Sequence, residues 1–239
     1  MDFWKWCAEH ARAIEIAVGA ATAIGTLVLA TVAVFQDTIR QLFYKPKFRI
    51  AIRCEPPDCV WVPFTNLQTG AFIAHSVYLR LWIENTGNAP ARNVEVYAKE
   101  LRLHRADGTW ERVREFPPMN LLWANPPGTV YWPVIVSEMG KHCDLAHIVD
   151  PALRAQRGEE NPALGLPPDR TSLAFDLMAA PNHKGHIVGP GRYQLDIVVA
   201  AENSRPLTET VEINLEGPWY ADETRMLRDG VGVRIVRIA

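Results

Sequence analysis

The chain has little net charge and few cysteines. Its 25 Lys and Arg residues and 27 Asp and Glu residues give a formal net charge of −2 over 239 residues. Proteins that bind nucleic acid through its phosphates need a concentration of basic residues, so this balance argues against nucleic acid as a partner. The four cysteines are scattered, unlike the dense cysteines of a disulfide-stapled secreted module.

Linear catalytic motifs are missing as well. The sequence has no G-x-S-x-G nucleophile elbow, no P-loop, no G-x-G-x-x-G after a predicted strand and no H-E-x-x-H. The run GPGR at 189–192 precedes a predicted strand, so it has no helix N-terminus with which to hold phosphate. We therefore expect a chain that is not an enzyme and that uses no cofactor.

A long uncharged apolar run extends from Ile16 to Phe35. A helix rises about 1.5 Å per residue, so about 20 apolar residues cross the hydrocarbon core of a bilayer. We predict a transmembrane helix at about 14–36, within an N-terminal segment 1–44. The alternatives are a cleaved signal peptide and a buried helix of a soluble protein. A signal peptide has a short basic lead-in, whereas this lead-in is long and carries both charges.

Basic residues are unevenly distributed around this run. Lys5 and Arg12 precede it, and a larger group follows closely: Arg40, Lys45, Lys47, Arg49 and Arg53. An excess of Lys and Arg marks the cytoplasmic side of a membrane helix. The pattern predicts a single-pass protein of the inner (cytoplasmic) membrane, with the N-terminus outside and residues 45–239 in the cytoplasm. The alternative is an exported envelope domain held by an uncleaved signal.

Small residues recur along one face of the predicted membrane helix. Ala13, Ala17, Ala21 and Gly25 are spaced four apart, and Thr22 lies beside them. Small side chains let helix backbones approach closely in lipid. The spacing therefore predicts a packing face through which the chain forms a homo-oligomer. The alternative is that alanine and glycine are simply common in membrane helices.

The remainder of the chain, 45–239, reads as β-structure. Short segments with alternating apolar residues are separated by turn residues, which is typical of antiparallel sheets. Short helices are predicted at 151–157 and 221–228. The expected fold is mainly β, an antiparallel immunoglobulin-like β-sandwich preceded by one N-terminal transmembrane α-helix. The predicted strands are 47–54, 77–85, 93–105, 109–115, 172–178, 192–202, 207–216 and 231–238.

Two stretches resemble a known family. LRLWIENTGNAPARNVEVYAKEL (79–101) has the pattern N-x-G-x-x-x-A-x-x-V-x-V, and 188–216 has paired strands entered by Pro-Gly-x-Tyr. Both are similar to bacterial immunoglobulin-like modules of the CARDB type, here in a single-pass membrane protein. The resemblance implies a non-catalytic binding or spacer domain. We expect Asn85 to Gly87 to turn one strand out of its sheet, and Ala91 and Val94 to return the next strand to the core.

The least regular part of the domain is the proline-rich segment 125–170. A connection this long inside a compact domain is uncommon and is usually functional or disordered. We predict an irregular insertion there. It either covers one edge of the sandwich or binds a partner or ligand.

Metal-ligating and partner-binding residues give only weak signals. Cys54 and Cys59 are spaced C-x4-C, and Cys143 and His147 lie in H-C-x3-H; these four residues would form a zinc site only if the fold brought them together. Unpaired thiols are the expected state, so no metal is predicted. Trp82 lies on the opposite face of its strand from the apolar residues, and Trp132 lies in the insertion. Both are candidate contacts with a partner, because tryptophan is enriched in interface hot spots.

Two hypotheses for function follow. The first is a membrane-anchored binding module, in contact with the lipid bilayer and with an unknown protein partner through its cytoplasmic domain. The second is a ligand-gated membrane effector, for example of a bacterial defence system, whose sandwich senses a small signal.

Overall fold

The computed structural model describes residues 6, 10–66, 68–124 and 128–236, with the backbone alone for 37–42. The chain divides into two compact units, Met1–Tyr44 and Lys45–Ala239; the second is called the sandwich domain below. Most of the predicted N-terminal tail (1–5 and 7–9, including Lys5 and Cys7) and residues 125–127 of the predicted insertion lie outside the described residues.

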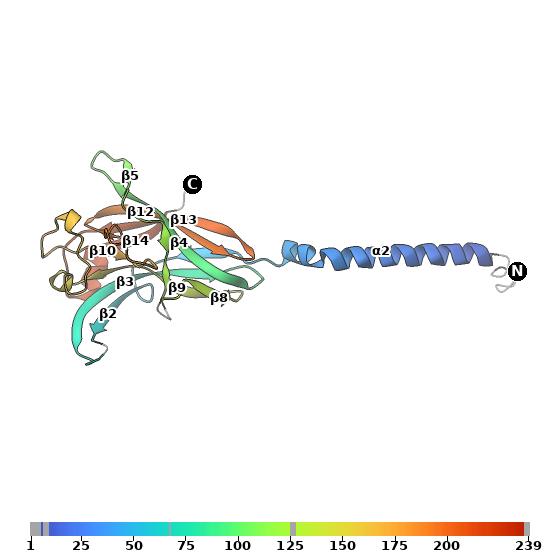
Figure 1. The fold of residues 1–239 in the computed structure, drawn as a ribbon, viewed down its shortest axis with the longest axis horizontal. Helices are drawn as coiled ribbons and strands as arrows, with labels where there is room; N and C mark the ends of the chain where they lie inside the picture. Colours follow the sequence, from blue (N-terminus) through green and yellow to red (C-terminus); the bar gives the residue numbers. More distant parts are fainter. Residues whose placement is uncertain (1–5, 7–9, 67, 125–127, 237–239) are drawn as a thin grey trace. The chain divides into compact units, whose positions relative to one another are not determined.

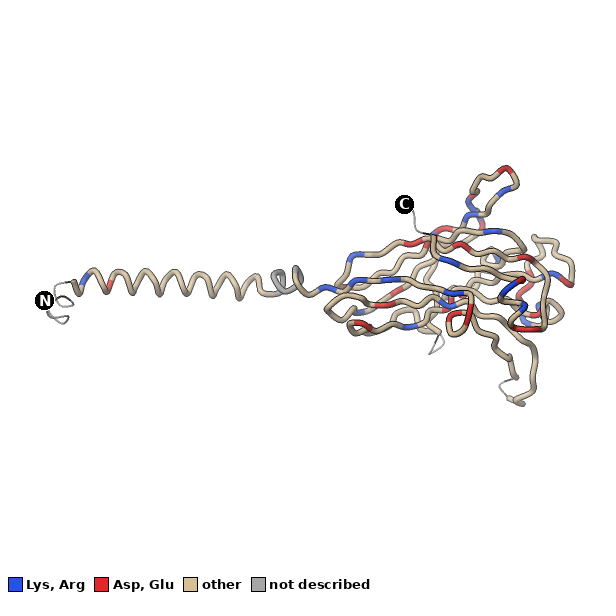
Figure 2. The backbone as a smooth tube through the Cα atoms, turned by 180° about the vertical axis from the view of Figure 1, so that it is seen from behind, with Lys and Arg blue, Asp and Glu red and all other residues tan. Residues whose placement is uncertain are grey.

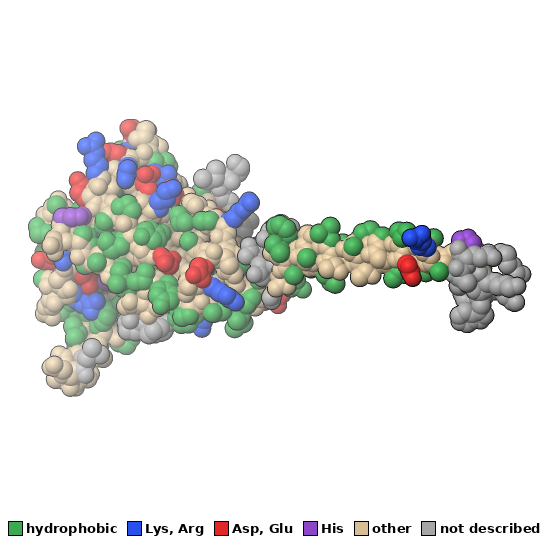
Figure 3. All heavy atoms as spheres, turned by 45° about the vertical axis from the view of Figure 1, so that its right-hand side comes forward, with side chains coloured by type: hydrophobic (Ala, Val, Ile, Leu, Met, Phe, Trp, Pro, Cys, Tyr) green, Lys and Arg blue, Asp and Glu red, His purple; other side chains and the backbone are tan. Residues whose placement is uncertain are grey.

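The first unit is one long helix, α2 (Ala11–Phe43). Its stretch Ala11–Gln36 is long and apolar enough to cross a membrane. Figure 3 shows apolar side chains along the surface of α2, and the charged ones that the structure describes lie near its start. The prediction of one N-terminal helix that is long and apolar enough to span a membrane is therefore confirmed.

Seven strands form the first sheet, sheet A, within the described residues. Its order is β1-β3-β9-β10-β11, with β2 beside β3 and β7 beside β9, and all the pairings are antiparallel (Figure 1). The strands are β1 (Phe48–Ala51), β2 (Cys59–Thr65), β3 (Phe72–Asn85), β7 (Leu122–Trp123), β9 (Met139–Val149), β10 (Leu173–Phe175) and β11 (Ile187–Val188).

The second sheet, sheet B, also has seven strands among the described residues. Its order is β14-β13-β12-β4-β5, with β6 and β8 beside β4. Charged residues of both signs are spread over the strands of both sheets (Figure 2). The strands are β4 (Ala91–His104), β5 (Trp110–Arg112), β6 (Met119–Asn120), β8 (Tyr131–Ile135), β12 (Gly191–Ala201), β13 (Ser204–Leu215) and β14 (Val231–Val236).

One apolar core joins the two sheets. Successive side chains of a strand point to opposite faces, so alternating sequence gives each strand one buried face. In β3, Leu79, Leu81 and Ile83 are fully buried while the residues between them are half-buried. The mainly β, two-sheet antiparallel sandwich is confirmed.

The prediction for 125–170 was wrong in its first half. Residues 139–149 form β9, which pairs with β3 along most of its length and lies in the middle of sheet A. Residues 131–135 form β8 on sheet B. The second half is irregular, with the short 3₁₀ helices η1 (Pro151–Leu153) and η2 (Pro162–Leu164).

The helical prediction near the C-terminus, 221–228, holds two residues further along the chain and in a different helical form. One turn of α-helix, α3 (Glu223–Arg225), continues into a π-helical segment, η3 (Met226–Gly230). Asp222 caps this pair, since its carboxylate accepts a hydrogen bond from the Arg225 amide at 2.8 Å. Strand β2 was missed altogether. Among the described residues it pairs with β3 alone, and it contains Pro63. Proline is tolerated there because an edge strand leaves one side unpaired.

The loop after β3 follows the sequence prediction closely. Asn85 is fully buried, and its Oδ1 accepts hydrogen bonds from the amides of Lys47 and Gly87 at 3.2 and 3.0 Å. Its Nδ2 donates to the carbonyl oxygens of Ala89 and Ile135 at 2.7 and 3.0 Å. One side chain therefore ties the domain entry, the loop and the end of β8 together. Beyond the loop, Ala91 and Val94 return to the core with no exposed surface.

Candidate functional site

The outer face of sheet A carries polar and aromatic side chains in cross-strand pairs. Tyr78, Arg80 and Trp82 of β3 lie opposite His147, Asp144 and His142 of β9, respectively. We call these six residues the polar ladder. Arg80 Nε donates to Asp144 Oδ1 at 2.9 Å, and both aromatic–histidine pairs have ring centroids about 5 Å apart (5.1 Å for Tyr78–His147, 4.8 Å for Trp82–His142).

The end of the polar ladder at the Tyr78–His147 pair is covered by other residues, and we call it the closed end. His147 is buried, with its Nδ1 2.9 Å from Asp176 Oδ1 and its Nε2 3.2 Å from Glu159 Oε2. Burial alone would lower the pKa of His147, but the two carboxylates outweigh burial and raise that pKa to about 10. The imidazole is therefore held as a cation with a carboxylate at each ring nitrogen. The Nδ1 contact with Asp176 has hydrogen-bond geometry, whereas Nε2 meets Glu159 at ion-pair distance without a hydrogen bond.

The pKa values of two carboxyl groups at the closed end are shifted as well. Burial raises the pKa of Asp144 to about 6, with help from Asp176 and against the opposing effect of Arg80. Burial also acts to raise the pKa of Glu159, but pairing with His147 and Arg157 outweighs it and lowers that pKa. These shifts describe a compact ion network, which favours a structural role for the closed end.

A covering segment, residues 150–166, closes this end. Arg157 donates to Glu159 at 2.9 Å, and its guanidinium carbon lies 3.6 Å from the ring centroid of Phe64. Asn161 Nδ2 donates to the carbonyl oxygens of Lys184 and Ile187, each at 3.1 Å. The irregular half of 125–170 therefore covers part of the outer face of sheet A, whereas the sequence hypothesis of a covering segment placed it over an edge of the sandwich.

The other end of the ladder is open. A hollow of about 370 Å³ lies there, lined by Trp82, His142, Asp58 and neighbouring residues of β1 and the β1–β2 loop. His142 Nε2 and Asp58 Oδ1 are 3.1 Å apart. A side chain on Gly140 would overlap the indole of Trp82, so this glycine makes room for the ring. Trp82 remains half-buried and forms one wall of the hollow.

Arginines form the rim of this hollow. The Arg53 side chain is 63% exposed, and its Nε lies 3.4 Å from Asp58 Oδ2. Arg49 Nε donates to Glu84 Oε2 at 2.7 Å. An aromatic wall beside fixed charges of both signs matches the anchor residues of protein interfaces, which are enriched in tryptophan and arginine.

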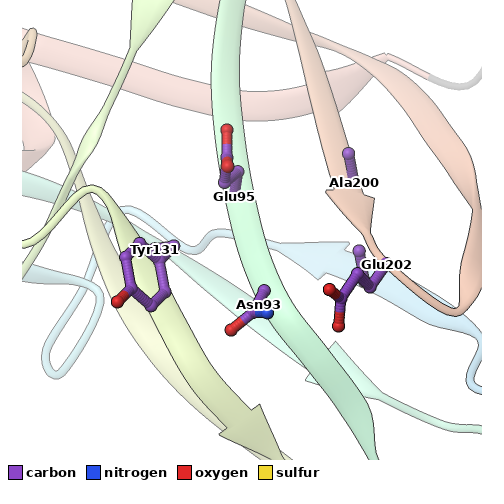
Figure 4. A pocket seen from close by; sticks show the side chains of 6 residues that line it. Asn93, Glu95, Tyr131, Ala200 and Glu202 are labelled. Atoms are coloured by element: carbon purple, nitrogen blue, oxygen red, sulfur yellow. The ribbon is translucent and has the colours of Figure 1, made fainter.

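A larger hollow lies on sheet B. It measures about 540 Å³ and is lined by residues of β4, β8 and β12 with the adjoining turn. In Figure 4, Asn93 and Glu95 of β4 lie between Tyr131 and the segment with Ala200 and Glu202. Glu95 already accepts a hydrogen bond from Asn120 at 2.9 Å. We favour the smaller hollow as the contact site, because convergent aromatic and charged groups decide recognition more than volume does.

The candidate metal residues are not brought together as one site. Cys54 and Cys59 are neighbours: their hydrogen bond lowers the pKa of Cys54 and raises that of Cys59. Cys143 lies opposite core residue Leu81, and its thiol donates to the Leu122 carbonyl at 3.2 Å. His147 lies on the other face of the sheet, opposite Tyr78. Among the described residues, no group of three or more His, Cys, Asp and Glu side chains is placed to hold a metal ion.

The other residues predicted from the sequence, Trp132 and the small residues of α2, lie away from the polar ladder. Trp132 is half-buried, 5.9 Å from Trp123 between ring centroids, with Lys141 Nζ 4.8 Å above its ring. This packing leaves Trp82 as the stronger candidate contact. In α2, Ala17, Ala21 and Gly25 are exposed, and the Thr22 hydroxyl donates to the Val18 carbonyl at 2.8 Å within the helix.

Sequence reasoning missed Asp58, His142 and Glu159 as parts of this face. The strand alternation that exposed Trp82 would have placed His142 beside it, had β9 been recognised. Asp58 and Glu159 lie in loops, where no periodic pattern signals a contact.

Fold and site together define a two-sheet antiparallel β-sandwich preceded by a long apolar helix, with a polar, partly covered outer face on one sheet. No protein-family model matches this chain, and no curated protein matches it. The β-sandwich fold is therefore established by the structure, while the CARDB-type assignment remains a prediction from the two sequence stretches.

Proposed function

We propose that this protein is a membrane-anchored, non-catalytic binding module that contacts a protein partner through the hollow around Trp82. The observation that carries the proposal is the half-exposed Trp82 ring, fixed between Gly140 and His142 and bordered by arginines. A preorganised aromatic anchor loses little conformational entropy on binding.

A binding role is favoured over catalysis by the state of the histidines. His147 is buried and has a carboxylate oxygen 2.9 Å from Nδ1 and another 3.2 Å from Nε2. His142 directs Nε2 to Asp58, whose second oxygen accepts the Arg53 amide at 3.0 Å. The contacts of His147 leave that buried imidazole inaccessible as a base, and the contact of His142 with Asp58 fixes the orientation of its ring.

The proposed location rests on α2 and the charges that flank it. Its apolar stretch is long enough to span a bilayer, and the basic residues after it favour a cytoplasmic sandwich domain. A homo-oligomer formed through Ala17, Ala21 and Gly25 is part of the same proposal.

Site-specific photocrosslinking in cells tests the contact site. A photoreactive amino acid at Arg53, on the rim of the hollow, is expected to form an adduct with the partner, whereas one at exposed Tyr97 on sheet B is not. Trp82→Ala should reduce the Arg53 adduct by on the order of tenfold, because truncating an interface tryptophan costs about 2 kcal/mol or more.

Equal adduct yields from positions 53 and 97 would contradict the proposed site. So would an adduct yield at position 53 that Trp82→Ala leaves unchanged. An unchanged thermal unfolding midpoint would show that the variant retains its fold. The ligand-gated effector stays the alternative hypothesis, and crosslinks from Arg53 that change only when a small signal is added would favour it.

A further inference from the structure

We propose that the end of the sandwich at which the chain enters is itself a docking surface for anionic lipid headgroups. This inference rests on the membrane anchoring proposed above and goes beyond it, since it assigns a lipid contact to the β-domain. The surface consists of Lys45, Lys47, Arg92 and Arg205 with the β8–β9 turn, residues 136–139.

The entry residues are fixed to the domain. Pro46 is buried between exposed Lys45 and Lys47. The Lys45 amide donates to Asn88 Oδ1 at 3.0 Å, and the Thr86 amide donates to the Lys47 carbonyl at 2.7 Å. The two lysines are therefore presented by an ordered part of the sandwich.

The β8–β9 turn, which connects sheet B to sheet A, adjoins this entry. Ser137 Oγ donates to the Gly87 carbonyl, and the Glu138 amide donates to the Asn85 carbonyl at 2.8 Å. The turn displays apolar side chains: Val136 is 50% exposed and Met139 is 56% exposed. Exposed apolar residues beside lysines are the composition of a surface that enters the headgroup layer.

Two arginines extend the basic character of this end. The Arg92 amide donates to Asn203 Oδ1 at 3.1 Å, and Asn203 Nδ2 donates to the Pro90 carbonyl at 2.9 Å. These bonds link the β12–β13 turn to the loop before β4, and Arg205 lies at the start of β13 directly after this turn. Figure 2 shows Lys and Arg positions close to the point at which the chain enters the domain.

The charges at this end favour an anionic surface. Within the part of the chain that the structure describes, the ion pairs do not include Lys45, Lys47, Arg92 or Arg205. The nearby carboxylates outside ion pairs are Glu138 on the β8–β9 turn and Glu202 on the β12–β13 turn, so four positive charges face two negative ones. Glu84 also lies next to the entry, but it is paired with Arg49. Cytoplasmic leaflets carry anionic lipid, which attracts basic residues next to a membrane helix.

The length of chain between anchor and domain allows the contact. From Gln36, where the apolar stretch ends, to Phe43, where α2 ends, the helix rises roughly 10 Å. Headgroups add about 5–8 Å on each side of the hydrocarbon core. The entry lysines can thus lie within about one Debye length of the lipid charges.

Fluorescence quenching in nanodiscs tests the contact with the full-length chain. The protein carries Cys7→Ser and one added cysteine, Val136→Cys, labelled with an environment-sensitive fluorophore. We expect a headgroup spin-labelled lipid to quench this label in phosphatidylserine-containing nanodiscs and much less in phosphatidylcholine alone. The double variant Lys47→Glu/Arg92→Glu should lower the contacting population by roughly tenfold or more, since each cation near an anionic surface contributes a several-fold preference.

Matched controls separate this surface from the rest of the domain. Ala106→Cys carries the label on the β4–β5 turn, roughly 45 Å along β4 from Ala91, and should show no lipid-dependent quenching. Arg114→Glu, a charge reversal at an exposed arginine after β5, should leave quenching at position 136 unchanged. The Cys7→Ser protein without an added cysteine measures labelling of the native thiols.

Equal quenching at positions 136 and 106, or quenching indifferent to anionic lipid, would overturn the proposal. Protection of the label at position 136 without quenching by the spin-labelled lipid would also overturn it and would assign this end to another copy or to a protein. Co-purification of the protein with the nanodisc reports anchoring independently, so a failed anchor is distinguished from a failed docking surface.

Discussion

His147 is a cation enclosed by two carboxylates on the outer face of a sheet. Such a buried group stabilises the fold only while its partners and its proton are present. Its pKa of about 10 in the folded protein lies above the ordinary histidine value of about 6.5. The folded state therefore keeps a proton that the unfolded chain releases between these two values.

The stability of the sandwich domain is predicted to fall as pH rises from about 6.5 towards 10. The contribution of His147 is complete below about pH 6.5 and is lost through its folded pKa, with a slope of at most about 1.4 kcal/mol per pH unit. Unfolding of the detergent-solubilised protein, followed by tryptophan fluorescence at a series of pH values, measures this slope.

The control is the triple variant His147→Gln/Glu159→Gln/Asp176→Asn, in which neutral amides replace all three groups. Its slope over the same range should be much smaller, while titration of Cys54 is common to both proteins. Parallel slopes for the two proteins would show that His147 does not hold its proton in this way. The pKa of Asp144 is raised to about 6, so its titration changes the stability mainly below this pH range.

Single residues were predictable where they follow strand alternation or a turn motif. Trp82 was placed on the outer face from the pattern of its neighbours, and Asn85 and Gly87 were assigned to the turn. The ion pairs of the two ladder histidines were not predictable, because Asp58, Glu159 and Asp176 reach them from irregular segments. Sequence spacing carries no information on such contacts.

Among the elements, β9 shows why a central strand was mistaken for an irregular segment. A bulge near Leu145 shifts its register against β3, and all five residues from Leu145 to Val149 are buried. The core covers one face and segment 150–166 covers the other, so the usual alternation is lost. A strand buried on both faces reads as a short apolar run, and the prolines nearby favoured a loop.

The loop after β3 gives a direct test at the level of elements. A Cβ at Gly87 would overlap the backbone of Lys45 and Lys47, which cannot move without disturbing the domain entry. Gly87→Ala should therefore lower the free energy of unfolding by about 1–3 kcal/mol. Chemical denaturation of the purified protein measures the change.

Gly232→Ala in β14 is the matched control. A Cβ there meets only Asn214 Cβ at 3.8 Å, an ordinary van der Waals contact, so the change in stability should stay within about 0.5 kcal/mol. Equal effects of the two substitutions would show that the entry does not pack closely against the loop.

At the scale of the whole molecule, helix α2 is the element with the simplest sequence signal and the least tested role. The small-residue face is predicted to mediate self-association. Gly25→Leu should abolish oligomer crosslinks in membranes, because a bulky side chain keeps the helices apart. The added side chain has open space in the single helix, so a loss would not reflect damage to the helix itself.

Gly19→Leu serves as the comparison, since this glycine also has open space and lies on the opposite side of the helix from Ala21 and Gly25. Oligomer crosslinks should persist in Gly19→Leu. Equal loss in both variants, or a monomer pattern in the unmodified protein, would contradict the packing face.

The central claim is a binding module held at the membrane with its sandwich in the cytoplasm. Paired reporters fused after Ala239 test it most directly: a fluorescent protein that matures only in the cytoplasm and a phosphatase that is active only outside it, each produced in bacterial cells. We predict bright fluorescence and a silent phosphatase. An active phosphatase with no fluorescence would place the sandwich on the other side of the membrane and contradict the account.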